Sequence, residues 1–343
     1  MDHSFDPNGV GVNNGNYFGF PFSPEEGKLV LLSVPWDATT SYRRGTANGP
    51  RSIIEASVQL DFFDEDVSEA WNLGIATLPL NEEMEQWNEQ ASAASEEVID
   101  ALENGQALTS DLKAKVVQVN QWSNQVGSWV KEESAQWLNR GKLVGLVGGE
   151  HSCPLGLMKA LGDIHPEYGI LQIDAHADLR PAYEGFTYSH ASIMYNMLKE
   201  VSSVKKLVQV GIRDFCEQEW HLIQEDNRIQ AFTDRSLKKA LLEGESWKTC
   251  VDRIISALPD KVYLSVDIDG LDPSLCPHTG TPVPGGLSYD QLTYLIQSIP
   301  MAGKQIIGFD LCEVSPDNHG EWDQNVGARL LYFLANRTLL SKA

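Results

Sequence analysis

Short apolar runs alternate with amphipathic stretches along most of this chain. The apolar runs, which we expect to form buried strands, are Leu29–Val34, Leu143–Val147, Ile170–Ile173, Leu207–Ile212, Val262–Ile268 and Ile306–Leu311. The amphipathic stretches, long enough for crossover helices, include Ser152–Leu161, Ser189–Glu200, Trp247–Leu258 and Tyr289–Ile299. Because parallel strands need crossover connections, the alternation predicts an α/β fold with a mainly parallel sheet covered by helices on both faces.

Two segments depart from this alternation. Residues 1–22 are rich in Gly, Asn, Pro and Phe and show no periodicity, so we expect an irregular arm on the surface, followed by a single domain over residues 23–343. Residues 81–140 predict a helical insertion broken near Asn104–Gly105. Its tryptophans are most simply explained by packing between helices or onto the core. An insertion that binds a partner or another subunit is the alternative. These tryptophans are Trp87, Trp122, Trp129 and Trp137.

The composition excludes several classes of protein. The chain has 26 Lys and Arg against 48 Asp and Glu, a net charge of −22, which argues against binding to a nucleic acid polyanion. No apolar run reaches eighteen residues and the first residues lack a signal-peptide pattern, so we expect no membrane span and a cytoplasmic protein. The 5 cysteines form no CxxC pair, which predicts reduced thiols.

Acidic and imidazole side chains follow three of the predicted strands. Asp, His and Asp alternate over residues 174–178, two aspartates alternate over residues 267–269, and a histidine follows Gly148–Gly149. In extended chain, alternate side chains point to one side. Because parallel strands present their carboxyl ends at one edge of a sheet, we expect the three segments to meet there. The predicted ligand set is His151, Asp174, His176, Asp178, Asp267 and Asp269.

Four crowded carboxylates require compensating cations. A site dominated by carboxylates with few imidazoles suits a hard or borderline divalent ion, Mn²⁺ above all. Six protein ligands would leave a single octahedral ion without an open position, so two ions that share carboxylates are the simpler arrangement, and a paired site can generate a hydroxide at neutral pH. Each motif alone has another explanation, as a turn, a helix cap or a core histidine. Their combination in one chain favours the metal site.

At these motifs the sequence resembles the ureohydrolase family of arginases, agmatinases, guanidinobutyrases and formiminoglutamases. The resemblance extends from about Leu29 to the C-terminus and implies a three-layer α/β/α domain around a mainly parallel eight-stranded sheet. It also implies two Mn²⁺ per chain, with Ni²⁺, Co²⁺ or Zn²⁺ as alternatives, and a homo-oligomer, either a trimer or a hexamer. The matching segments are Gly148–Ser152, Asp174–Asp178, Ser265–Pro273, Thr279–Leu287 and Gly308–Pro316.

The resemblance assigns roles to individual residues. It implies that Asp174 and Asp267 bridge the two ions, that His151 and Asp178 complete the shell of one ion, and that His176 and Asp269 complete the other. Glu313 matches the acid that holds the substrate guanidinium, and His190 matches a proton shuttle or general base. Asp178 would also pass a proton to the leaving amine. A salt-bridge role for Glu313 and a helix N-terminal role for His190 are the simpler alternatives.

The loop after Asp178 indicates which substrate the chain takes. Residues 179–185 lack the Asn and Ser that the arginase pattern places there and resemble agmatinases that carry YEG followed by YSHA. Arg180 would repel the free amine of agmatine and favour a substrate with a carboxylate, such as guanidinobutyrate, whereas Glu184 would offset the charge of Arg180. We expect Arg180 and Glu184 to contact the substrate. The sequence therefore predicts a metal-dependent hydrolase that cleaves a small cationic guanidino compound, agmatine to urea and putrescine. Guanidinobutyrase, arginase or another guanidine hydrolase are alternatives.

Two readings of other classes are weaker. A non-catalytic, metal-stabilised scaffold could use the helical insertion and the acidic surface to bind a basic partner, but the ligand set is complete. Hydrolysis of a non-guanidine amide by the same metals is the other reading. Glu313 and Thr279–Leu287 favour guanidines.

Overall fold

The computed structural model describes residues 5–317 and 320–341. Eight parallel strands form one sheet in the order β2-β1-β3-β8-β7-β4-β5-β6. Each predicted strand is present, whereas the two short edge strands, β2 and β6, were not predicted. The strands are β1 (Leu29–Val34), β2 (Ile75–Thr77), β3 (Leu143–Gly148), β4 (Tyr168–Ile173), β5 (Val204–Val210), β6 (Ile229–Phe232), β7 (Lys261–Asp267) and β8 (Gln305–Cys312).

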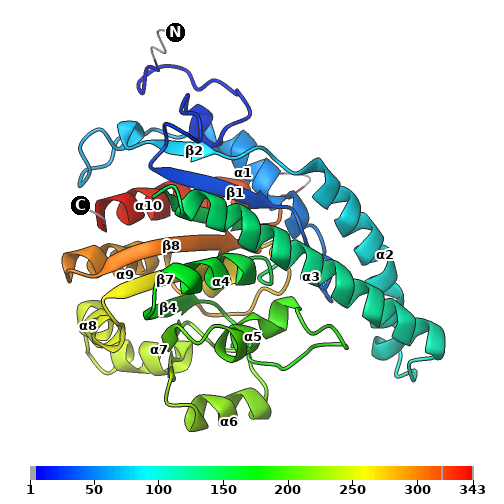
Figure 1. Cartoon of the computed structure of the whole chain (residues 1–343). Helices are drawn as coiled ribbons and strands as arrows, with labels where there is room; N and C mark the ends of the chain where they lie inside the picture. Colours follow the sequence, from blue (N-terminus) through cyan, green and yellow to red (C-terminus); the bar gives the residue numbers. More distant parts are fainter. Residues whose placement is uncertain (1–4, 318–319, 342–343) are drawn as a thin grey trace.

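Helices cover both faces of the sheet and make three layers (Figure 1). One face carries α1 (Gly49–Ser57), α7 (Asp234–Leu242), α8 (Trp247–Ala257), α9 (Tyr289–Met301) and α10 (Trp322–Ser341). The other carries α2 (Glu82–Glu103), α3 (Ser110–Leu138), α4 (Leu155–Ile164), α5 (Ile193–Glu200) and α6 (Glu217–Glu225). The predicted α/β/α architecture is therefore confirmed.

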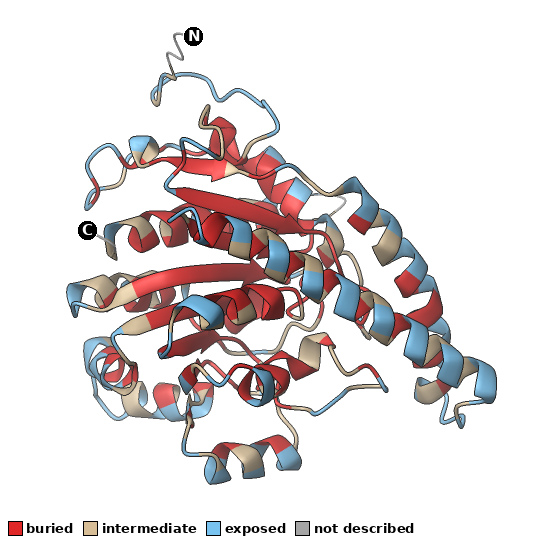
Figure 2. Ribbon diagram, in the orientation of Figure 1, coloured by how far each residue is buried: buried red, intermediate tan, exposed pale blue. Residues whose placement is uncertain are grey.

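Two hydrophobic cores explain why the central strands are apolar at every position. Along β1, Leu29 and Leu31 pack in the core beneath α1 and α10, whereas Val30 and Leu32 pack in the core beneath α3 and α4. Successive side chains of a strand point to opposite faces of the sheet. A sheet covered by helices on both faces therefore needs apolar residues at successive positions of its strands. Figure 2 shows the resulting buried strands between helices whose outer faces are exposed. In the described part of the chain, no helix is long and apolar enough to cross a membrane.

The segment predicted as a helical insertion forms a long hairpin of α2 and α3, and its being an insertion stays a prediction. The chain breaks where it was expected to, because α2 ends at Glu103 and Gly105 adopts a left-handed φ of +68°. Thr109 begins α3 by accepting a hydrogen bond from the main-chain N–H of Leu112. Trp87 of α2 and Trp122 of α3 stack with their ring centroids 6.0 Å apart, so these two tryptophans pack helix against helix.

The N-terminal segment is irregular apart from a 3-10 turn at Tyr17–Gly19. Its first part is exposed, as Val10 and Val12 show, but Tyr17, Phe18 and Phe20 are buried in the core beneath α1 and α10. The expectation of an arm lying wholly on the surface is therefore wrong for its second half. Burial of large aromatic side chains stabilises the fold by more free energy than ordering the irregular backbone costs, so these side chains anchor the segment.

Candidate active site

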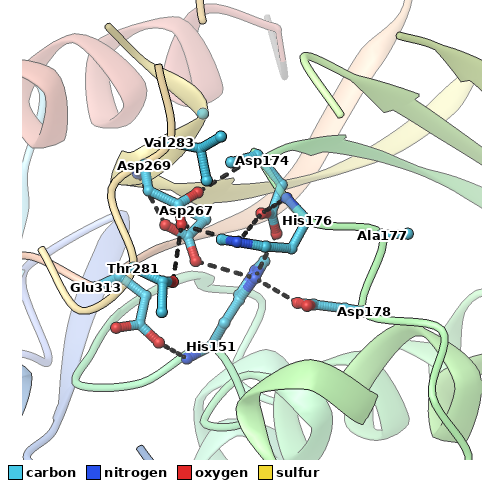
Figure 3. A network of polar contacts seen from close by, with 12 residues as sticks. His151, Asp174, His176, Ala177, Asp178, Asp267, Asp269, Thr281, Val283 and Glu313 are labelled. Carbon is cyan, nitrogen blue, oxygen red and sulfur yellow. Dashed lines mark hydrogen bonds and ion pairs between the residues drawn. The ribbon is translucent and has the colours of Figure 1, made fainter. Parts of the chain in front are cut away.

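Four neighbouring strands in the middle of the sheet bring the predicted site residues together. His151 follows β3, Asp174 follows β4, Asp267 ends β7 and Glu313 follows β8 (Figure 3). A glycine is required before His151, since a Cβ on Gly149 would lie 2.2 Å from the carbonyl oxygen of Trp36. The carboxyl edge of the sheet is thus the place where the site forms.

The first group of ligands surrounds His151. Its Nδ1 atom lies 2.9 Å from Asp174 Oδ2, 3.0 Å from Asp178 Oδ2 and 3.5 Å from Asp267 Oδ2. The other ring nitrogen, Nε2, lies 2.9 Å from Ser265 Oγ, with Asp310 Oδ1 at 3.7 Å. A hydrogen bond to one ring nitrogen fixes the orientation of the imidazole, which leaves Nδ1 directed at the carboxylates.

The second group surrounds His176 and shares one aspartate with the first. His176 Nδ1 lies 3.0 Å from Asp269 Oδ2 and 3.6 Å from Asp174 Oδ1. The ligand atoms of His151, Asp174 and Asp267 lie within 4.8 Å of one another, and so do those of Asp174, His176 and Asp269. Asp174 thus belongs to both groups. The bridging roles of Asp174 and Asp267 stay predictions.

Tight turns, rather than extended chain, make the ligands converge. Asp174 Oδ1 accepts the main-chain N–H of His176 at 2.6 Å, and Asp267 Oδ1 accepts that of Asp269 at 2.8 Å. Residues Ile268–Gly270 form a 3-10 turn and Asp178 has a left-handed φ of +54°. The expectation of period-two geometry is therefore wrong beyond the strand ends, because short carboxylates compete for the backbone donors that a strand would use.

The crowding of acids shifts their proton affinities. Burial, together with the charge of Asp174, raises the pKa of Asp178 to about 7. Although burial opposes the change, the adjacent carboxylates of Asp174 and Asp178 raise the pKa of His151 well above its usual range. In the metal-free chain, protons thus balance the negative charge of the cluster. A divalent cation can do the same and would displace them.

The donor set fits a pair of divalent cations. His151 Nδ1 and Asp178 Oδ2 are buried and lack a well-aligned hydrogen bond, although each has oppositely charged or acceptor groups close by. Buried polar atoms without partners are costly, so a ligand that satisfies both is expected. Carboxylate oxygens with two imidazoles are donors that suit Mn²⁺ and similar ions.

A cavity of about 190 Å³ opens onto the ligands. His176, Asp178, Arg180, Tyr183 and His190 line it, so the predicted substrate contacts at Arg180 and His190 lie beside the predicted metal ligands. The Arg180 guanidinium lies 4.9 Å above the Tyr183 ring and its Nε lies 3.8 Å from Glu219 Oε2. Glu219 and this ring thus hold Arg180 at the wall of the cavity.

Glu184 lies elsewhere. It is not among the described residues that line this cavity, and burial, with the charge of Glu103 at the end of α2, raises its pKa to about 7. Its predicted contact with the substrate stays a prediction that the geometry does not favour.

Glu313 is buried directly after β8. It is 6% exposed and has a left-handed φ of +64°, and its Oε1 accepts the main-chain N–H of His151 at 2.9 Å. A Cβ on Gly280 would lie 3.2 Å from Oε2, so the glycine keeps space beside that oxygen. Burial, then the charge of Glu150, raises the pKa of Glu313 well above its usual range. A bound cation would restore its charge.

Thr39 and Glu150 support His190 and were not predicted as site residues. Thr39 Oγ1 donates to Glu150 Oε1 at 2.7 Å and accepts the main-chain N–H of His190 at 3.2 Å. Burial, then the nearby His176, lowers the pKa of His190 to about 4, so its ring is neutral at neutral pH. The acid in the GGEHS motif was the available signal for Glu150, because a fully buried carboxylate needs donors. Thr39 carries no such signal.

The cysteines beside the motifs are not poised for nucleophilic attack. Cys153, Cys276 and Cys312 are buried free thiols, and burial raises the pKa of each. A thiol needs a lowered pKa to be reactive, so packing is the role that fits these residues.

Comparison with known proteins identifies the family of the chain. The model of the arginase family matches residues 27–335. The chain is 34% identical to the N(1)-aminopropylagmatine ureohydrolase of Thermus thermophilus over 92% of each chain, and 26% identical to the agmatinase of Pyrococcus horikoshii over 90% of this chain and 92% of that one. The structure of an agmatine ureohydrolase from Thermoplasma volcanium superposes with a TM-score of 0.69 at 25% identity, over 93% of this chain and 92% of the other. The chain therefore belongs to the arginase family of ureohydrolases, as an agmatinase-like member.

Proposed function

We propose that the chain hydrolyses a guanidino amine to urea and an amine in the cavity beside His176, with two Mn²⁺ ions as cofactors. The observation that carries the proposal is the pair of ligand groups sharing Asp174, with Glu313 beside them. Two divalent cations bound there would lower the pKa of a shared water and so supply a nucleophile near neutral pH.

The protein residues orient the substrate and move protons. Glu313 Oε2 would accept charge-assisted hydrogen bonds from the planar guanidinium and hold its carbon toward the ligand groups. His190, neutral and supported by Thr39, would accept a proton at the cavity wall, and Asp178 would take a proton from the attacking water and pass it to the leaving amine. Both side chains line the cavity, as these roles require.

We propose N1-aminopropylagmatine as the substrate, with agmatine as the second candidate. A relative that carries the first name is 34% identical over 92% of this chain, whereas the agmatinase reported above is 26% identical. Arg180 does not oppose an amine strongly, because Glu219 shares its charge. Asp214 lies at the exposed lining of the cavity, where a carboxylate can face an ammonium group on the substrate tail. Agmatine is favoured instead by the YEG and YSHA segments.

Urea release from a panel of substrates tests the proposal. The panel is N1-aminopropylagmatine, agmatine, arginine, guanidinobutyrate and guanidine, assayed after loading with Mn²⁺, Ni²⁺, Co²⁺ or Zn²⁺ and after chelation. We expect the largest kcat/KM for N1-aminopropylagmatine with Mn²⁺ and no turnover after chelation. A larger value for guanidinobutyrate or arginine would reject the amine assignment. No urea from any compound would favour the non-catalytic scaffold.

Glu313→Gln tests the guanidinium contact separately from metal binding. The amide keeps the size and one acceptor oxygen but loses the negative charge, so kcat/KM should fall roughly thirty-fold to several thousand-fold while metal content stays unchanged. Glu217→Gln, on the exposed face of α6, is the matched control. A variant that loses its ions would make Glu313 a metal ligand or its support instead.

We infer from the family resemblance that the chain forms a trimer or a hexamer, and we propose separately that it works in the cytoplasm. Sedimentation of the metal-loaded protein measures the first, and a monomer at micromolar concentration would contradict it. Fractionation of the source cells measures the second.

A further inference from the structure

A separate hydrophobic cluster forms between the outer halves of α2 and α3. Its buried members are Ala94, Val98 and Ile99 of α2, Val119 of α3, and Phe186, which comes from the loop between β4 and α5. Phe186 is fully buried, although the residues on both sides of it are not. The hairpin therefore encloses a side chain that belongs to a different part of the fold.

Hydrogen bonds fix the same loop to α3. Asn120 Nδ2 donates to the main-chain oxygen of Gly185 at 3.0 Å, and its Oδ1 accepts the main-chain N–H of Thr187 at 2.8 Å. The loop approaches α3 closely, because a Cβ on Gly185 would lie 3.1 Å from a methyl group of Val116. One helix side chain thus binds the backbone on both sides of Phe186.

The anchored residue is connected to the wall of the substrate cavity. Tyr183 and Phe186 exchange two main-chain hydrogen bonds, from Tyr183 N–H at 3.1 Å and from Phe186 N–H at 2.8 Å. The Tyr183 ring lies edge-on to the His190 ring, with centroids 6.0 Å apart, and beneath the Arg180 guanidinium. Fixing Phe186 therefore fixes the aromatic ring that contacts both cavity residues.

We propose that the α2–α3 hairpin is a positioning element for the substrate site: by holding Phe186 and the loop backbone through Asn120, it sets Tyr183 against His190 and Arg180. The inference rests on the proposed function for the role of the cavity, but the contacts themselves do not depend on it. Anchoring orders the loop before the substrate arrives, so less ordering entropy is lost on binding. Tyr183 and Asn120 are positioning residues in this scheme.

The test compares two asparagines on one face of α3. Asn120→Ala removes both bonds to the loop. Asn124→Ala, one turn further on, removes only a bond to the main-chain oxygen of Asn120 within the helix. Loss of two hydrogen bonds should expose the loop more often, so hydrogen exchange of the amides over residues 182–189 should be about tenfold faster in Asn120→Ala and unchanged in Asn124→Ala.

Kinetics of the Mn²⁺-loaded protein give the functional measurement. Asn120→Ala should lower kcat/KM about tenfold, mainly through KM, with metal content and Tm close to wild type, whereas Asn124→Ala should match wild type. In a Tyr183→Ala background the same substitution should have little further effect, because the ring that the loop positions is absent. Full additivity would show that Asn120 acts by another route.

The outcomes separate this inference from the proposed function. Normal exchange and normal kinetics in Asn120→Ala would overturn the inference while leaving the function intact. If exchange of the loop is faster in Asn120→Ala but the wild-type protein releases no urea from any guanidine, the contact between hairpin and loop is upheld and the proposed function is rejected. If Asn120→Ala unfolds, Asn120→Asp keeps the acceptor for Thr187 and should show a smaller change in the same direction.

Discussion

The two ligand groups use the same residue types but differ in exposure. The His151 side chain is 1% exposed and its second ring nitrogen contacts Ser265, with Asp310 behind it, whereas the His176 side chain is 25% exposed and lines the cavity. A closed shell with an oriented ligand favours firm binding, and an open one leaves a position for a substrate or water. We therefore expect the ion of the His151 group to be held more tightly than the ion of the His176 group.

Asp174→Asn should have the largest effect, because Asp174 belongs to both groups. Losing the charge of the shared ligand should remove both ions and lower kcat/KM about a thousandfold or more. Metal analysis per chain and urea release measure the two losses. Asp252→Asn, on the exposed face of α8, is the control. Retention of one tightly bound ion would mean that the two groups are independent.

His176→Asn and His151→Asn should separate the two groups. In His176→Asn the His151 group keeps its own ligands, so about one ion per chain should remain after dialysis. In His151→Asn only the more open His176 group remains, so less than one ion per chain should be retained after dialysis. Activity should be low in both, since the proposed reaction uses both ions. If His176→Asn loses more metal than His151→Asn, the order of affinities proposed here is reversed.

Asp310→Asn should act on the His151 group alone and more weakly. The carboxylate lies 3.7 Å from His151 Nε2, the ring nitrogen that contacts Ser265, and not at Nδ1, which faces the other predicted ligands. Changes to such supporting residues typically cost 10- to 100-fold in metal affinity, so about that loss is expected for one of two ions. Titration of the metal-free variant with Mn²⁺ measures it. Equal weakening of both ions would show that Asp310 supports the whole centre.

The pH dependence of stability should be the smallest effect. In the metal-free chain the raised pKa of Asp178, about 7 against an ordinary 3.8, means that the folded state holds more protons than the unfolded state between these values. This stability is fully present below pH 3.8 and is lost as pH rises through about 7. Tm of the chelated protein should therefore fall by a few degrees between pH 5 and 8, relative to Asp178→Asn. The Mn²⁺-loaded protein should not show this difference, because the ions replace the protons.

The fold could be predicted wherever the hydrophobic pattern was strong. The central strands are long and apolar on both faces, so they stand out. The edge strands Ile75–Thr77 and Ile229–Phe232 are too short to show a period. The helix α10 carries polar residues such as Asn336 and Arg337 at buried positions, which conceals its packing face. Burial of Phe18 and Phe20 also depends on partners far along the chain, which no local pattern shows.

The convergence of the predicted metal ligands could be foreseen because strand ends place them, whereas the contacts of Thr39 and Asn120 could not. Asp174 and Asp267 occupy fixed positions after apolar runs, so sequence and topology together locate them. The Thr39 hydroxyl contacts His190, which lies 151 positions further along the chain. No motif around Thr39 in the sequence marks this hydroxyl as part of a site. Asn120 binds a loop 65 positions away. Such contacts follow from the packing of loops and helices, which the periodicity of single elements does not determine.

The short strands at both edges of the sheet have a consequence for self-association. Unpaired N–H and C=O groups at a sheet edge are a template on which a second chain can add a strand and begin to aggregate. Here β2 pairs through three residues and β6 through four, so each edge offers few such groups. The net charge of −22 adds repulsion between copies. The six longer strands, which would expose the most unpaired backbone groups if they lay at an edge, all lie inside the sheet.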